Sequence, residues 1–169
     1  GDILTAYNGK TIEVLNTDAE GRLILADALA YASKQYDPEY MLDFATLTGA
    51  VVVTLGHIAT GLMSNNDTLV ENIKVSSDNT GEHVWQLPLW EEYCDQVKSD
   101  VADVKNLGSP GQAGTIAGAA FLKAFVGKDI PWAHFDVAGT SYHVENRSYI
   151  QKNSASGQVI RLVLDLLGA

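Results

Sequence analysis

Apolar and polar positions alternate with two periods along the chain, and each change of period marks an expected element. Short stretches rich in β-branched and aromatic residues predict strands at 3–7, 11–15, 40–47, 58–64 and 130–137. Longer apolar stretches predict helices at 21–34, 115–126 and 159–167, and an amphipathic stretch predicts one at 68–77. A further helix is expected at 91–98. Alternating strands and helices predict an α/β fold whose sheet is mixed, largely parallel, and covered by helices on both faces.

The segments between these elements carry local signals. Asn8-Gly9 predicts a type I′ hairpin turn, and Asn65-Asn66-Asp67 predicts a turn and helix cap. We expect Asn79-Thr80-Gly81 to end the helix that follows this cap. We expect 84–90 to be an extended link, 100–114 a glycine-rich turn region and 138–158 a polar loop. The helix at 21–34 is apolar nearly all round, so we expect it to be buried on more than one side.

Composition narrows the possible partners and the compartment. The 169 residues, 46% hydrophobic and 19% charged, fit one globular domain with a full core. A formal charge of −10 argues against nucleic acid or an anionic membrane as partner, and no apolar run approaches the ~20 residues of a membrane span. The single cysteine, Cys94, excludes an intramolecular disulfide and a thiolate zinc cluster, and it indicates a reducing compartment.

The polar turn Asn16–Arg22 is the first candidate site, and its spacing allows two interpretations. Asp18 and Glu20 lie two residues apart in an irregular turn, where their carboxylates could bind a divalent metal while Arg22 faces an anion. The same residues fit a capping box, in which Thr17 and Glu20 satisfy the first backbone groups of the following helix. The spacing alone leaves both interpretations open.

Three other features have an ordinary structural interpretation beside the functional one. The turn 46–50 can present backbone groups to a ligand or simply join a strand to a helix. The glycines at 108, 111, 114 and 118 fit neither the Walker pattern nor GxGxxG, so a close backbone approach or a mobile loop is favoured over phosphate binding. His57, His83, His134 and His143 have no paired spacing, and we expect each to be structural.

The stretch Asn-Thr-Asp-Ala-Glu-Gly-Arg-Leu at 16–23 resembles the signature of the leucyl (cytosol) aminopeptidase family, M17 type. Further segments resemble that family in the same order along essentially the whole chain. They include 1–4, 8–11, 45–50, 85–89, 102–104, 119–122 and 132–139.

The resemblance implies part of a three-layer catalytic domain that releases N-terminal amino acids, leucine preferentially, from peptide substrates with two Zn²⁺ or Mn²⁺ ions. By this resemblance Asp18 binds one metal, Glu20 bridges both, and Arg22 holds a bicarbonate-like base. Leu47 and Gly49 hydrogen-bond the substrate backbone, while Thr46 and Ala138 line the pocket for its first side chain. The family also implies a cytoplasmic homohexamer.

The family pattern also needs a lysine and two aspartates as metal ligands and a second catalytic lysine, all upstream of the region matched here. We therefore expect residues 1–169 to be the C-terminal portion of the catalytic domain, without the N-terminal domain and the first part of the sheet. Such a chain is expected to be inactive alone. The alternative is a non-catalytic α/β module for assembly or regulation.

Overall fold

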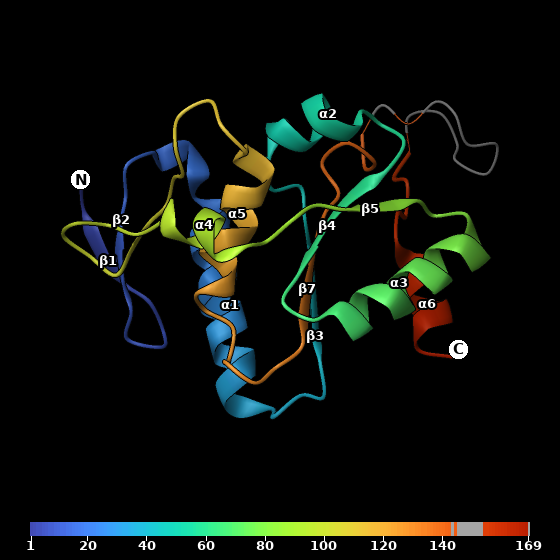
Figure 1. The fold of residues 1–169 in the computed structure, drawn as a ribbon, viewed down its shortest axis with the longest axis horizontal. Coiled ribbons are helices and arrows are strands. Elements are labelled where there is room, and N and C mark those ends of the chain that lie inside the picture. Colours follow the sequence, from blue (N-terminus) through green and yellow to red (C-terminus); the bar gives the residue numbers. More distant parts are fainter. Residues whose placement is uncertain (143, 145–153, 169) are drawn as a thin grey trace. The chain divides into compact units, whose positions relative to one another are not determined.

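The computed structural model describes residues 1–142, 144 and 154–168, which form two compact units (Figure 1). The first unit comprises Gly1–Met41 and Pro88–Trp132, and the second comprises Leu42–Leu87 and Ala133–Ala169. Each unit combines helices with strands, and both sheets contain parallel and antiparallel neighbours. The α/β class with a mixed sheet is therefore confirmed.

The sheet of the first unit has the order β1-β2-β6. β1 (Ile3–Thr5) and β2 (Thr11–Glu13) form the expected antiparallel hairpin, in which Leu4 lies opposite Ile12. β6 (Val104–Lys105) pairs with β2 in parallel, with Ile12 opposite Val104. The sequence gives no strand signal at β6, since glycine and polar residues surround this two-residue strand.

The hairpin turn differs from the expected type I′ geometry. A type I′ turn needs positive φ at both central residues, but only Gly9, at φ 88°, has it there. The amide of Gly9 donates to the Ala6 carbonyl at 2.8 Å, and the Asn8 side-chain oxygen accepts from Lys10 N–H at 3.1 Å. A longer turn closed by the asparagine side chain replaces the two-residue turn.

Three helices build the core of the first unit. α5 (Gly114–Lys123) is buried from Thr115 to Leu122 and packs against α1 (Gly21–Gln35) and α4 (Glu91–Asp95). α1 buries four side chains, those of Arg22, Ala26, Leu29 and Ala30, which lie along one side of the helix. Ile24 on α1 is 74% exposed, so the expectation that this helix is buried on more than one side is wrong for this chain.

The second unit holds a four-stranded sheet of order β3-β7-β4-β5. Its strands are β3 (Met41–Ala45), β4 (Thr60–Ser64), β5 (Val84–Gln86) and β7 (Trp132–Asp136). β4 is parallel to β5 and antiparallel to β7, and β7 is buried along its whole length. α2 (Gly49–Leu55) and α3 (Asp67–Thr80) both pack against β4.

Capping residues fix the limits of α3 as the sequence predicts. The Asn66 side chain accepts from Leu69 N–H at 2.8 Å at the N-terminus, and Gly81 ends the helix in the left-handed conformation at φ 69°.

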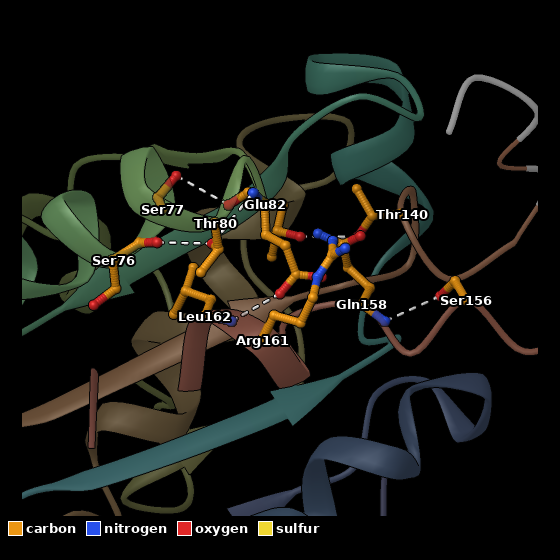
Figure 2. A network of polar contacts seen from close by, with 10 residues as sticks. Ser76, Ser77, Thr80, Glu82, Thr140, Ser156, Gln158, Arg161 and Leu162 are labelled. Atoms are coloured by element: carbon orange, nitrogen blue, oxygen red, sulfur yellow. Dashed lines mark hydrogen bonds and ion pairs between the residues drawn. The ribbon is translucent and has the colours of Figure 1, made fainter. Parts of the chain in front are cut away.

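The C-terminal helix α6 (Ile160–Leu166) packs on α3 and is tied down by a buried carboxylate (Figure 2). Glu82, which is 1% exposed, accepts from Leu162 N–H at 2.9 Å and from the Arg161 guanidinium at 3.2 Å. The Ser77 hydroxyl donates to the Glu82 carbonyl at 2.9 Å, so this segment is held from the end of α3.

The remaining differences from the sequence expectations concern element ends. The helix expected at 91–98 ends at Asp95, and the one expected at 115–126 ends at Lys123. Residues 143 and 145–153 of the loop expected at 138–158 lie outside the described residues. Across 1–142, 144 and 154–168, every helix is too short or too polar to cross a bilayer.

Candidate functional site

The turn between β2 and α1 carries the first group of candidate residues. It contains the short 3-10 helix η1 (Thr17–Ala19), which is capped by Asn16, whose side-chain oxygen accepts from Asp18 N–H at 2.9 Å. Glu20 stands at the N-cap of α1 without a side-chain cap hydrogen bond. The capping-box interpretation of Thr17 and Glu20 is therefore wrong, because Asn16 fixes the turn through a different helix, η1.

Asp18 and Glu20 are both exposed on this turn. Their carboxylates are thus held by a fixed backbone and remain accessible to a ligand from solvent. Carboxylate oxygens suit hard divalent ions and also Zn²⁺. The two carboxylates can therefore supply some of the ligands of a metal site.

A buried asparagine that sequence reasoning missed holds the turn in place. Asn106, which is 0% exposed, accepts through its side-chain oxygen from the N–H groups of Leu15 at 2.8 Å and Asn16 at 3.3 Å. Its side-chain amide donates to the carbonyls of Asn16 at 2.7 Å and Ala19 at 3.4 Å. The carboxamide therefore pairs with backbone groups before and within η1.

Arg22 is held by the same residue. It is 8% exposed, and its guanidinium donates to the Asn106 backbone carbonyl at 3.0 Å. A guanidinium offers five N–H donors in a rigid fork, so an anchor on one arm orients the whole group. Asn106 thus contacts the turn that carries Asp18 and the arginine that follows it.

The second group of candidates lies in the second unit, where β3 and β7 end. Thr46 and Gly49 are exposed, while Leu47 and Ala138 are partly buried. Thr48 begins α2, and its hydroxyl oxygen accepts from Val51 N–H at 3.2 Å. This is the strand-to-helix turn that the sequence predicts.

Asp136, the last residue of β7, joins the loops that follow the two strands. It is 0% exposed, and one carboxylate oxygen accepts from Leu47 N–H and from Ala138 N–H, each at 3.2 Å. The other oxygen accepts from the Thr48 hydroxyl at 2.7 Å. One buried carboxylate therefore contacts both segments that contain candidate substrate-binding residues.

Gly139, directly after Ala138, shows how closely these loops approach. A Cβ atom added there would lie 2.2 Å from the Gly56 carbonyl oxygen. The Gly139 carbonyl lies 2.7 Å from His57 Nδ1, so the close contact is fixed from both sides. Only glycine fits this approach of two backbones.

Asp18, Glu20 and Arg22 thus lie on one turn of the first unit. Thr46, Leu47, Gly49 and Ala138 lie beside Asp136 in the second unit. Among the described residues, no three histidine, cysteine, aspartate or glutamate side chains are grouped so that they could hold a metal ion. The two carboxylates of the first unit are fewer than a two-metal site requires.

The other candidate features have structural roles where they are described. A Cβ at Gly108 would lie 2.6 Å from Ala117 Cβ, so this glycine allows the loop to pack on α5. His134 is fully buried, with Nδ1 2.6 Å from an Asp43 carboxylate oxygen. His143 lies outside the described residues.

Comparisons with known proteins all point to the same family. Residues 1–164 match the model of the cytosol aminopeptidase family, catalytic domain. A probable cytosol aminopeptidase of Chlorobium luteolum is 53% identical over 167 residues, which cover 99% of this chain and 32% of that protein. A probable cytosol aminopeptidase of Desulfotalea psychrophila is also 53% identical, over 99% of this chain and 33% of that protein.

A solved structure agrees with these matches. A tomato leucine aminopeptidase mutant, K354E, superposes with a TM-score of 0.89 at 46% identity, covering 98% of this chain and 31% of that one. The chain therefore spans about a third of the length of the proteins it matches.

Proposed function

The chain belongs to the cytosol aminopeptidase family, and on that premise we propose that it is part of a metal-dependent aminopeptidase. The proposed reaction is release of N-terminal amino acids from peptides, with leucine preferred. The observation that carries the proposal is the match of residues 1–164 to the catalytic domain of that family. Residues 1–169 then form the C-terminal portion of that domain.

Asp18 and Glu20 are the proposed metal ligands in this chain. Both carboxylates are exposed, and the turn that carries them is fixed by Asn16 and Asn106. Two divalent ions, Zn²⁺ or Mn²⁺, when bound, supply a Lewis acid for the substrate carbonyl and lower the pKa of a water molecule. The role of the protein is to hold the two carboxylates in a fixed geometry.

Arg22 is proposed to orient an anion of the bicarbonate type that accepts a proton during the reaction. Its anchor on the Asn106 carbonyl supports this role, since a fixed guanidinium can stabilise charge without reorganising. The two exposed acids and the buried arginine thus come from adjoining positions of the chain, 18 to 22.

Leu47 and Gly49 are proposed to bind the substrate backbone. The N–H of Leu47 already donates to Asp136, so Leu47 offers its carbonyl oxygen as an acceptor. Gly49 is the first residue of α2, where a backbone N–H has no partner within the helix and can donate. An acceptor and a donor two residues apart match the backbone groups of an extended peptide. Thr46 and Ala138 are proposed to line the space for the first side chain.

We expect the 169 residues alone to lack turnover, because Asp18 and Glu20 cannot hold two ions by themselves. Assembly into a homo-oligomer, a hexamer in the complete enzyme, and a cytoplasmic location are further parts of the proposal. Exposed apolar side chains such as Ile24 and Val53, at 74% and 91% exposed, support burial against further protein.

Hydrolysis of leucine p-nitroanilide with Mn²⁺ tests this function. The full-length protein that contains this chain should release p-nitroaniline, and Asp18→Asn should lower kcat by at least about a hundredfold. Glu39→Gln, which removes another exposed acid of the first unit, is the matched control and should leave kcat unchanged. Equal activity of the wild type and Asp18→Asn would refute the role of Asp18, and an inactive wild type would refute the function.

A further inference from the structure

Asp136 has no role of its own in the proposed function. Its carboxylate is fully buried, and its hydrogen bonds with Leu47, Thr48 and Ala138 all go to the two loops that follow β3 and β7. A buried carboxylate is costly unless its oxygens are satisfied. Here two backbone N–H groups and one hydroxyl satisfy it.

The hydrogen bonds of Asp136 lie at the point where the backbone pairing of β3 and β7 ends. The backbone pairing of the two strands ends where Val137 N–H donates to the Ala45 carbonyl at 2.9 Å. One step further on, Leu47 N–H donates to the Asp136 side chain instead of to a backbone carbonyl of the neighbouring strand. The carboxylate therefore continues the connection between the strand ends where the backbones diverge.

Thr48 extends the connection into α2. Its hydroxyl donates to Asp136 at 2.7 Å and accepts from Val51 N–H at 3.2 Å. The hydroxyl proton is thereby directed to the carboxylate. Asp136 consequently fixes the start of α2, where Gly49 stands, relative to Leu47 and Ala138.

We propose that Asp136 is a positioning residue that sets the separation between Leu47 and Ala138, and through it the discrimination between first side chains of different size. This inference rests on the proposed function, in which those residues contact the first residue of the substrate. Asp136 acts through the groups that it holds, the N–H of Leu47, the N–H of Ala138 and the Thr48 hydroxyl. Replacement by asparagine keeps the shape but removes the charge and one of the two acceptor oxygens. The bonds from Leu47 and Ala138 N–H, which share one oxygen, are then weaker, and the Thr48 hydroxyl loses its acceptor.

The test compares two buried carboxylates of the second unit in the full-length protein. Asp136→Asn changes the residue in question, and Glu82→Gln is the matched control. Glu82 is likewise buried, and it accepts from Leu162 N–H and from the Arg161 guanidinium (Figure 2). Both partners belong to α6 and not to the loops that follow β3 and β7. The readout is the ratio of kcat/KM for leucine p-nitroanilide to kcat/KM for alanine p-nitroanilide.

We expect Asp136→Asn to lower this ratio about tenfold, a size typical of a lost fit for a few methylene groups. Glu82→Gln should lower thermal stability and leave the ratio unchanged. Thr48→Ser, which keeps the hydroxyl, should also preserve the ratio. An unchanged ratio in Asp136→Asn, or an equal change in Glu82→Gln, overturns the inference, because a purely structural role predicts no difference between the two.

Failure of the proposed function can be distinguished from failure of this inference about Asp136. If the wild-type protein hydrolyses neither substrate, the aminopeptidase proposal fails. Amide hydrogen exchange at Leu47 and Ala138 then still tests the positioning, since their N–H groups donate to Asp136. Exchange at both amides should be faster in Asp136→Asn than in Glu82→Gln. Equal exchange in the two variants overturns the inference on its own.

Discussion

The side-chain amide of Asn106 donates to the carbonyl of Asn16 over 2.7 Å, although 90 residues separate the two in the chain. This bond closes a set in which the same carboxamide also accepts from the N–H groups of Leu15 and Asn16. The turn that carries Asp18 and Glu20 is therefore held by the residue that follows β6 as well as by the Asn16 cap of η1.

Asn106→Ala should destabilise the first unit. The substitution removes both the donor and the acceptor of the carboxamide, so the backbone groups that bond to it lose their partners. We expect the free energy of unfolding to fall by about 2 kcal/mol. Asn66→Ala, which removes a single capping bond in the second unit, should cost about 1 kcal/mol. Urea unfolding of the two variants checks this, and a smaller loss for Asn106→Ala would contradict it.

Acid should weaken the connection between β2 and the segment before β6. Hydrogen bonds from the Thr11 backbone N–H and hydroxyl hold the pKa of the Asp103 carboxyl below its usual range. Because the folded-state pKa is lower than the unfolded one, this contribution to stability is complete above the unfolded-state pKa, about 4. It is lost as pH falls through the folded-state pKa.

The pKa of Asp103 can be followed by the carboxyl carbon signal in an NMR titration. Thr11→Val removes the hydroxyl donor and should raise the pKa of Asp103, with the backbone donor retained. Thr5→Val, at the position opposite Thr11 in the hairpin, is the matched control and should leave the pKa unchanged. A pKa of Asp103 that is the same in Thr11→Val and in the wild type would be inconsistent with this geometry.

Cys94 should react slowly with iodoacetamide at neutral pH. Burial raises the pKa of its thiol, and the Lys123 ammonium, whose Nζ lies 3.6 Å from Sγ, lowers it by a smaller amount. The thiolate fraction at pH 7.5 is then smaller than that of a free cysteine. Lys123→Gln should raise the pKa further and slow alkylation again, and faster alkylation in that variant would show that the lysine does not act this way.

Gly139→Ala should destabilise the second unit, because the new Cβ would lie 2.2 Å from the Gly56 carbonyl oxygen. Relief of such a contact requires backbone movement and should cost about 2–3 kcal/mol in the free energy of unfolding. Gly49→Ala is the matched control, since no heavy atom lies within 4 Å of its added Cβ. Thermal unfolding that shows equal melting temperatures for the two variants would disprove the close approach.

The sequence predicts the elements well where the signal is local. Asn66 and Gly81 mark the two ends of α3, and the alternation of apolar stretches leads to the α/β class. It also predicts which turns hold the candidate residues, since strand ends that lead into helices are visible as changes of period. Asp18, Glu20 and Arg22 come from one such turn.

The sequence does not reveal what holds these turns. Asn106 and Asp136 are single polar residues that follow or end buried strands, and their hydrogen bonds reach residues about 90 positions away. Local spacing carries no information on such contacts. The capping-box interpretation was wrong for the same reason, because Thr17 and Glu20 have the right spacing while Asn16 and Asn106 supply the bonds.

Metal stoichiometry tests the central claim, that Asp18 and Glu20 are metal ligands, most directly. Isothermal titration of the full-length protein with Mn²⁺ should show two sites per chain in the wild type and in the control Glu39→Gln. Glu20→Gln, which changes one of the two proposed metal ligands, should bind Mn²⁺ at least about tenfold more weakly. Two sites of unchanged affinity in Glu20→Gln would contradict the account.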